Sequence, residues 1–231
     1  MDDLSSKARP APTAQRPLLG VTVLIVEDSR FASEAVRLLC LRSGARIRRA
    51  DCIASAERHL ATYRPEVAIV DLGLPDGPGL SLIATLARAG SRPDVILATS
   101  GIDRADAETA AREAGADGFL AKPVEGLAAF QEAILAHLPP DRRPRGLREL
   151  STDAVQPDRL ALAEDLAQAE RLLIEGRVAP DFVAGFLQGL ARTGHDAELL
   201  SQARGLRGPL PDVRDRLMAL IASRKGERRI V

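Results

Sequence analysis

Polar and apolar positions follow two alternating patterns over the first 140 residues of the chain. Short apolar runs such as Val67–Val70 lack the polar alternation of a half-exposed strand, which is typical of strands covered on both faces of a parallel sheet. Between these runs, apolar residues recur with the spacing of one helix face. The pattern predicts an α/β fold with an open, doubly wound sheet, either Rossmann-like or flavodoxin-like. The five predicted strands are Val21–Val26, Ile47–Ala50, Val67–Val70, Val95–Ala98 and Gly118–Leu120.

Five helices are predicted between and after these strands. Three of them are followed by a glycine, at Gly44, Gly90 and Gly115. A helix often ends in a residue of left-handed conformation, and glycine adopts that conformation without steric cost, so we expect a left-handed C-cap at each. The predicted helices are Phe31–Leu41, Ala54–Tyr63, Leu80–Ala89, Arg104–Ala114 and Leu127–His137.

A different pattern begins near Asp158, where the apolar positions become helical throughout. About four such segments, separated by Gly and Pro, predict a small all-α bundle. The stretch before it is rich in Pro and Arg and is typical of a linker. We therefore expect a flexible leader at 1–17, an α/β domain at 18–138, a linker at 139–155 and a helical domain at 156–231.

The charge balance excludes some classes of protein. The chain has 32 basic and 32 acidic residues, whereas a sequence-blind nucleic-acid coat needs a basic excess. No apolar run reaches the roughly 18 residues of a membrane helix, and two cysteines cannot build a disulfide framework. The first 17 residues lack the apolar block of a signal peptide. We expect a cytoplasmic protein that does not interact with membranes.

Charged or hydroxyl side chains follow four of the predicted strands. Glu27 and Asp28 follow the first, Asp71 the third, Thr99 the fourth and Lys122 the fifth. The carboxyl ends of parallel strands meet at one edge of the sheet, so these groups should converge. Crowded carboxylates favour a divalent cation, and Mg²⁺ prefers oxygen ligands, whereas a hydroxyl and an ammonium suit phosphate oxygens. The set predicts a phosphoryl-transfer site with a carboxylate as nucleophile.

Four motifs carry a resemblance to a known family. The segments VLIVEDS, VAIVDLGLPDGPG, ILATSG and GFLAKP fall in order at the ends of predicted strands. Together they resemble the receiver domain of two-component response regulators over about residues 20 to 138. The resemblance implies a flavodoxin-like (βα)5 fold with a parallel sheet in the order 2-1-3-4-5.

The resemblance also implies a role for each matching residue. Asp71 would be the phosphoacceptor, phosphorylated by a sensor histidine kinase or a histidine phosphotransfer protein. Glu27 and Asp28 would hold Mg²⁺ together with Asp71 and the backbone carbonyl of Gly73. The protein would catalyse only its own phosphorylation and dephosphorylation, and would not be an enzyme acting on other substrates.

Three further positions match the family's switch. Thr99 and Phe119 would move inward on phosphorylation, and Lys122 would pair with the phosphoryl group. The family has a cis bond at the position of Lys122-Pro123. Phe119 lacks the phenolic hydroxyl of the tyrosine that other members carry, so a switch that uses this hydroxyl is excluded.

Simpler interpretations exist for single motifs. Asp28-Ser29 could only cap a helix, and the segment after Asp71 could only form a turn, given its Gly and Pro content. An aspartyl-phosphate phosphatase of haloacid-dehalogenase type also uses a strand-end aspartate and Mg²⁺. That family has a second aspartate two residues further on, where this chain has Gly73.

The sequence does not identify the output of the helical domain. We expect a protein-interaction or dimerisation module that engages a downstream protein or a second copy of the chain. The alternative is a DNA-binding transcriptional regulator, but the region shows only scattered Arg and a short basic end at 224–229. His195 is the one histidine of the region, and the acids Asp196 and Glu198 beside it disfavour phosphotransfer.

Overall fold

A computed structural model describes residues 10–101, 104–124, 126–146, 158–176, 178–206 and 212–226. Its centre is a five-stranded parallel sheet in the order β2-β1-β3-β6-β7. These five are the predicted strands, so the predicted flavodoxin-like order 2-1-3-4-5 is confirmed. A short two-stranded ribbon, β4 (Gly73–Leu74) and β5 (Gly77–Pro78), follows β3 and was not predicted. The strands of the large sheet are β1 (Thr22–Val26), β2 (Arg46–Ala50), β3 (Val67–Asp71), β6 (Val95–Ser100) and β7 (Gly118–Ala121).

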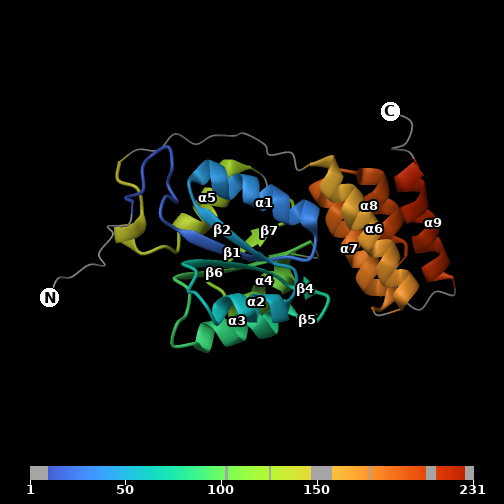
Figure 1. Ribbon diagram of the computed structural model, residues 1–231, viewed down its shortest axis with the longest axis horizontal. Helices are drawn as coiled ribbons and strands as arrows, with labels where there is room; N and C mark the ends of the chain where they lie inside the picture. The colour runs from blue at the N-terminus through green and yellow to red at the C-terminus, as the bar shows by residue number, and fades with distance from the viewer. Residues whose placement is uncertain are drawn as a thin grey trace.

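Helices cover both faces of this sheet (Figure 1). Because successive side chains of a strand point to opposite faces, Val23 and Ile25 pack with α1 (Arg30–Ser43) and α5 (Leu127–Leu135). Leu24 and Val26 pack on the other face with α2 (Ile53–Leu60), α3 (Gly79–Arg88) and α4 (Arg104–Glu113). The sheet is therefore buried on both sides, as the continuous apolar runs predicted.

Two of the three predicted glycine caps are present. Gly44 ends α1 with φ 84° and Gly115 follows α4 with φ 103°, both in the left-handed region. The prediction for Gly90 is wrong. Helix α3 ends at Arg88 and the next residue, Ala89, is already extended at φ −68° and ψ 139°, so the chain leaves this helix without a left-handed residue.

Four helices form the C-terminal part of the described chain, as predicted. They are α6 (Arg159–Glu175), α7 (Pro180–Thr193), α8 (Ala197–Arg204) and α9 (Val213–Gly226). Leu166, Leu187 and Leu217 are among the side chains buried between them. Figure 1 shows this group beside one end of α1, and we call it the C-terminal helices below.

Two basic residues of the predicted basic end form ion pairs within the C-terminal helices. Arg224 pairs with Glu198 at 3.2 Å and Lys225 with Glu170 at 2.5 Å. The remaining basic residues of that end lie outside the described residues. His195 lies in the turn between α7 and α8 with φ 53°, so it is not on a helix face from which a phosphotransfer histidine would act.

The start of the predicted linker contacts the α/β part. A short 3-10 helix, η1 (Pro140–Arg142), ends in an arginine that pairs with Asp94 at 2.6 Å and with Glu66 at 3.7 Å. Residues 147–155 of the linker and 1–9 of the leader lie outside the described residues. Among the described residues, no helix has both the length and the apolar character needed to cross a bilayer.

Candidate functional site

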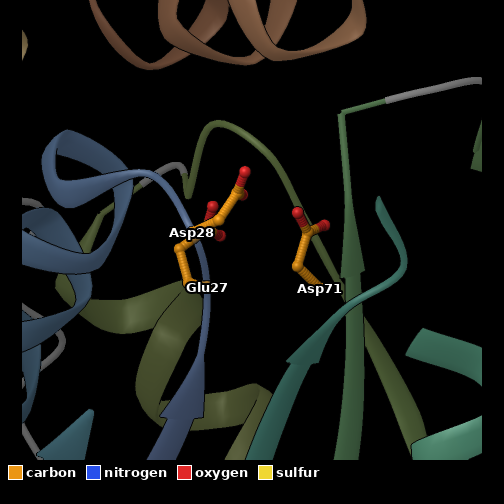
Figure 2. A group of neighbouring side chains, drawn as sticks. All are labelled: Glu27, Asp28 and Asp71. Carbon is orange, nitrogen blue, oxygen red and sulfur yellow. The ribbon is translucent and has the colours of Figure 1, made fainter. Parts of the chain in front are cut away.

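The three predicted carboxylates meet at the carboxyl edge of the sheet. Glu27 and Asp28 directly follow β1, and Asp71 is the last residue of β3. One oxygen from each lies within 4.8 Å of the others, and all three side chains are buried. Figure 2 shows the carboxylates facing one another across the gap between the two strands. The predicted juxtaposition of Asp28 and Asp71 is therefore confirmed.

Strand pairing explains why they meet. Strands β1 and β3 are hydrogen-bonded neighbours in parallel register, with Val26 opposite Val70, so the residues after them emerge side by side. The Glu27 amide still donates to the carbonyl of Ala50 at 2.9 Å, which continues the pairing with β2 past the end of β1. Sheet hydrogen bonds thus fix the backbone at the ends of β1 and β3, from which the three carboxylates extend.

Lys122 joins two of the carboxylates. It follows β7, and its Nζ lies 2.5 Å from Glu27 Oε2 and 3.1 Å from Asp71 Oδ1. Its side chain is only 11% exposed, so little water competes for these contacts. The peptide bond between Lys122 and Pro123 is cis, as the resemblance implied. One lysine therefore partly balances three buried acids.

The remaining imbalance appears in the ionisation of the site. Burial raises the pKa of Glu27 to about 7, against the attraction of Lys122. The pKa of Asp28 lies well above its usual range, because of burial first and then repulsion by Glu27 and Asp71. Burial lowers the pKa of Lys122, but attraction by Asp71 and Glu27 outweighs it and keeps the lysine charged. The edge thus favours any additional positive charge.

The acidic cluster has a free coordination position for such a charge. Among the described residues, Asp28 Oδ2 is buried and has no hydrogen-bond partner. A buried carboxylate oxygen without a partner is costly, and a bound cation would satisfy it. An all-oxygen set of carboxylates is the ligand chemistry of a hard divalent ion such as Mg²⁺. The residues present therefore fit the implied metal.

The other predicted site residues lie around this cluster. Thr99 is buried at the end of β6, directly opposite Asp71 in the sheet register. Phe119 is half-buried on β7, and Gly73 is exposed on β4, two residues after Asp71. The cavity over Asp71 is lined by Ser100, the last residue of β6, and by Gly101 after it, rather than by Thr99.

Two residues that the sequence did not single out shape the site. A Cβ on Gly79 would lie 1.9 Å from the carbonyl oxygen of Asp71, so only glycine lets α3 begin this close to the end of β3. Asp165 of α6 is fully buried against the start of α1. One signal for Asp165 was present, because a carboxylate interrupts the apolar stripe that includes Leu162, Leu166 and Ala169.

The fold and the site are those of a flavodoxin-like α/β protein with an acidic cation site at the carboxyl edge of its sheet. Residues 23–134 match the family model of the response regulator receiver domain. This part of the chain belongs to that family, whose receiver domains act in two-component signalling. The assignment made from the four motifs is confirmed.

Curated relatives match part of this chain. KdpE, the KDP operon transcriptional regulatory protein of Escherichia coli K12, is 36% identical over 101 residues, 44% of this chain and 44% of KdpE. The virulence transcriptional regulatory protein PhoP of Salmonella typhimurium strain 14028s is 29% identical over 143 residues, 57% of this chain and 63% of PhoP. The chain thus spans less than two thirds of these curated relatives.

Solved receiver domains are also similar. The signal receiver domain of a modulated diguanylate cyclase from Desulfovibrio desulfuricans G20 has 29% identity and a TM-score of 0.46. It covers 51% of this chain, and this chain covers 93% of it.

Proposed function

We propose that Asp71 accepts a phosphoryl group from a sensor histidine kinase or a histidine phosphotransfer protein. The observation that carries this proposal is the convergence of three buried carboxylates and one buried lysine, Lys122, at the carboxyl edge of the sheet. Asp71 lines a cavity, so its carboxylate is open to a phosphoryl group or a small molecule that enters there.

In the proposed transfer, an oxygen of Asp71 forms a bond to phosphorus while the P–N bond of the donor's phosphohistidine breaks. The imidazole leaves with the electron pair of that bond and takes up a proton. Lys122 already contacts Asp71 Oδ1 and is positioned to balance the charge of the phosphoryl oxygens. Glu27 keeps this lysine in place through its own ion pair at 2.5 Å.

A magnesium ion would be held by Glu27, Asp28 and Asp71, with the backbone carbonyl of Gly73 as a further ligand. Mg²⁺ at such a site supplies positive charge that offsets the negative charge of phosphate oxygens. The unpartnered oxygen of Asp28 supports this assignment.

Phosphorylation would act as a switch and not as a step of an enzymatic reaction on other substrates. Thr99 and Phe119 would respond to the phosphoryl group and change the surface of the receiver domain. The protein would then control a downstream protein partner in the cytoplasm through the C-terminal helices, as a monomer or a homodimer.

DNA binding is the second candidate output, favoured by the printed names of KdpE and PhoP as transcriptional regulators. Two basic residues of the C-terminal helices, Arg224 and Lys225, form ion pairs within the protein, which supports a protein partner instead. Recovery of genomic DNA that depends on phosphorylation would favour the DNA-binding alternative.

Phosphate-affinity electrophoresis tests the phosphoacceptor. Incubation with phosphoramidate and Mg²⁺ should shift the unmodified chain and leave Asp71→Asn unshifted, since the amide is a poor nucleophile. Asp51→Asn is a matched control, because Asp51 follows β2 at the same edge but is exposed. A retained shift in Asp71→Asn would show that another residue is the acceptor.

A further inference from the structure

The C-terminal helices are docked on the start of α1. Phe31, in the first turn of α1, is 5% exposed and belongs to the apolar core of the C-terminal helices rather than to the cores beside the sheet. A Cβ on Gly194, which follows α7, would lie 3.5 Å from its ring. The receiver domain thus contributes one aromatic side chain to the core of the other part.

A buried carboxylate fixes the position of this contact. Asp165 of α6 is fully buried and accepts three hydrogen bonds from the start of α1: from Ser29 Oγ at 2.8 Å, Arg30 N at 2.9 Å and Phe31 N at 2.9 Å. The first N–H groups of a helix have no partner inside the helix, and the positive end of the helix dipole favours an anion. The contact is therefore directional as well as apolar.

Helix α7 lies over Asp71 as a result. One cavity of about 140 Å³ is lined by Asp71, Asp28 and Lys122 from the receiver domain and by Phe182, Gly185, Phe186 and Gly189 from α7. A Cβ on Gly101 would lie only 3.7 Å from Gly189 Cα, so the two parts approach closely here. Figure 2 shows helical ribbon above the three carboxylates.

The size of this cavity selects between donors. One water needs about 10–15 Å³ of such a cavity volume, so the cavity has room for an ion, several waters and a small phosphate compound. A helix with its side chains is about 10 Å across, more than a cavity of about 140 Å³ can hold, so a helix that presents a phosphohistidine does not fit between α7 and Asp71 while the two are docked.

We propose that the C-terminal helices are a built-in cover of the phosphoacceptor: while docked they exclude a protein phosphodonor and admit only small molecules, and they must lift off α1 before a protein donor reaches Asp71. The proposal rests on the proposed function in naming the excluded donor. The docked contacts themselves are present in the unmodified chain and need no assumption about what Asp71 does.

Size-dependent labelling of a cysteine at the acceptor position tests the cover without any phosphoryl chemistry. The parent variant carries Asp71→Cys and Cys52→Ala. Cys40 is retained, because it is fully buried and burial raises the pKa of its thiol to about 12. The rate of labelling is measured with iodoacetamide and with a maleimide on a long polyethylene glycol chain. The ratio of the two rates cancels changes in the reactivity of the thiol.

Two variants on opposite sides of the contact should release the cover. Asp165→Arg places a cation at the positive end of α1, and Phe31→Ala removes the aromatic anchor. Each should raise the ratio of large-reagent to small-reagent rate about tenfold or more, equivalent to about 1.4 kcal/mol in the docking equilibrium. Glu170→Arg, on α6 but paired with Lys225, and Leu41→Ala, exposed on α1, are the matched controls and should leave the ratio unchanged.

A high ratio in the parent variant, or no change in both release variants, would overturn the proposal. Circular dichroism of each variant checks that the helices remain folded. Phosphoramidate labelling of Asp71 in the unmodified chain separates the two hypotheses. If Asp71 is phosphorylated but the cysteine assay shows a high ratio in the parent variant, only the cover is refuted. If the assay shows a low ratio but Asp71 is not phosphorylated, only its role as phosphoacceptor is refuted.

Discussion

A single lysine pairs with two of the three carboxylates at the strand ends. Lys122 contacts Glu27 and Asp71 but leaves Asp28 Oδ2 without a hydrogen-bond partner among the described residues. Burial and mutual repulsion make protonation easier, which is why the pKa values of Glu27 and Asp28 are raised. These raised pKa values couple the ionisation of the site to pH and to bound cations.

The sign of this coupling follows from the raised pKa values. Between the ordinary pKa of Glu27, 4.5, and its raised value of about 7, the folded chain binds protons that the unfolded chain has lost. In the absence of metal, Glu27 therefore lowers the free energy of unfolding as the pH rises through this range. Mg²⁺ competes with those protons, so its stabilising effect should grow with pH.

Thermal melts with and without Mg²⁺ measure the effect. We expect Mg²⁺ to raise the melting temperature more at about pH 8 than at about pH 6, because the carboxyls must lose protons to bind a metal. Glu27→Gln should flatten this dependence, and addition of a chelator should remove the Mg²⁺ effect at both values. An equal Mg²⁺ shift at the two pH values would contradict the coupling.

Helix ends determine how the elements join. Gly44 ends α1 at φ 84°, and a Cβ there would lie 2.9 Å from Arg16 Cβ, whereas a Cβ on Gly90 would meet no atom within 4 Å. Both glycines follow a predicted helix, but only one is needed for its conformation, because α3 is already extended at Ala89. The sequence alone does not distinguish these two helix ends.

Alanine at the two positions should therefore have opposite effects. Gly44→Ala should lower the free energy of unfolding by about 1–2 kcal/mol, the cost of a left-handed alanine. Gly90→Ala should leave it unchanged or raise it by about 0.4–1 kcal/mol, because the unfolded chain loses freedom. Urea denaturation with an unchanged m-value measures both. A larger loss for Gly90→Ala would contradict the assignment of the two caps.

The two halves of the chain have opposite net charges, but the contact between them does not follow these charges. Residues 1–140 hold 18 acidic and 16 basic residues, and residues 141–231 hold 14 and 16. Yet the contact uses acids of the net-basic part: Asp165 at the start of α1, and Glu164, whose pair with Arg30 is 2.7 Å long. The opposite net charges therefore do not explain this contact, which is held by hydrogen bonds and an ion pair at the start of α1.

Phosphorylation should weaken that contact, because negative charge added in the cavity repels Asp28 and Asp165, whose carboxyls already interact. Small-angle scattering with beryllofluoride and Mg²⁺, as a mimic of the phosphorylated state, should show a larger radius of gyration than the untreated chain. Asp71→Asn is the control and should not respond. An unchanged radius in the unmodified chain would mean that phosphorylation does not release the C-terminal helices.

The sequence by itself determined the receiver fold and its site. Four of the five strands carry a functional residue within one or two positions of their end, and parallel strands end at one edge, so local pattern alone predicts that Glu27, Asp28, Asp71 and Lys122 meet. Only the tertiary structure decided where the C-terminal helices dock. Asp165 and Ser29 are 136 residues apart in the sequence. An apolar pattern predicts that Phe31 is buried but not which residues bury it, because the hydrophobic effect is not directional.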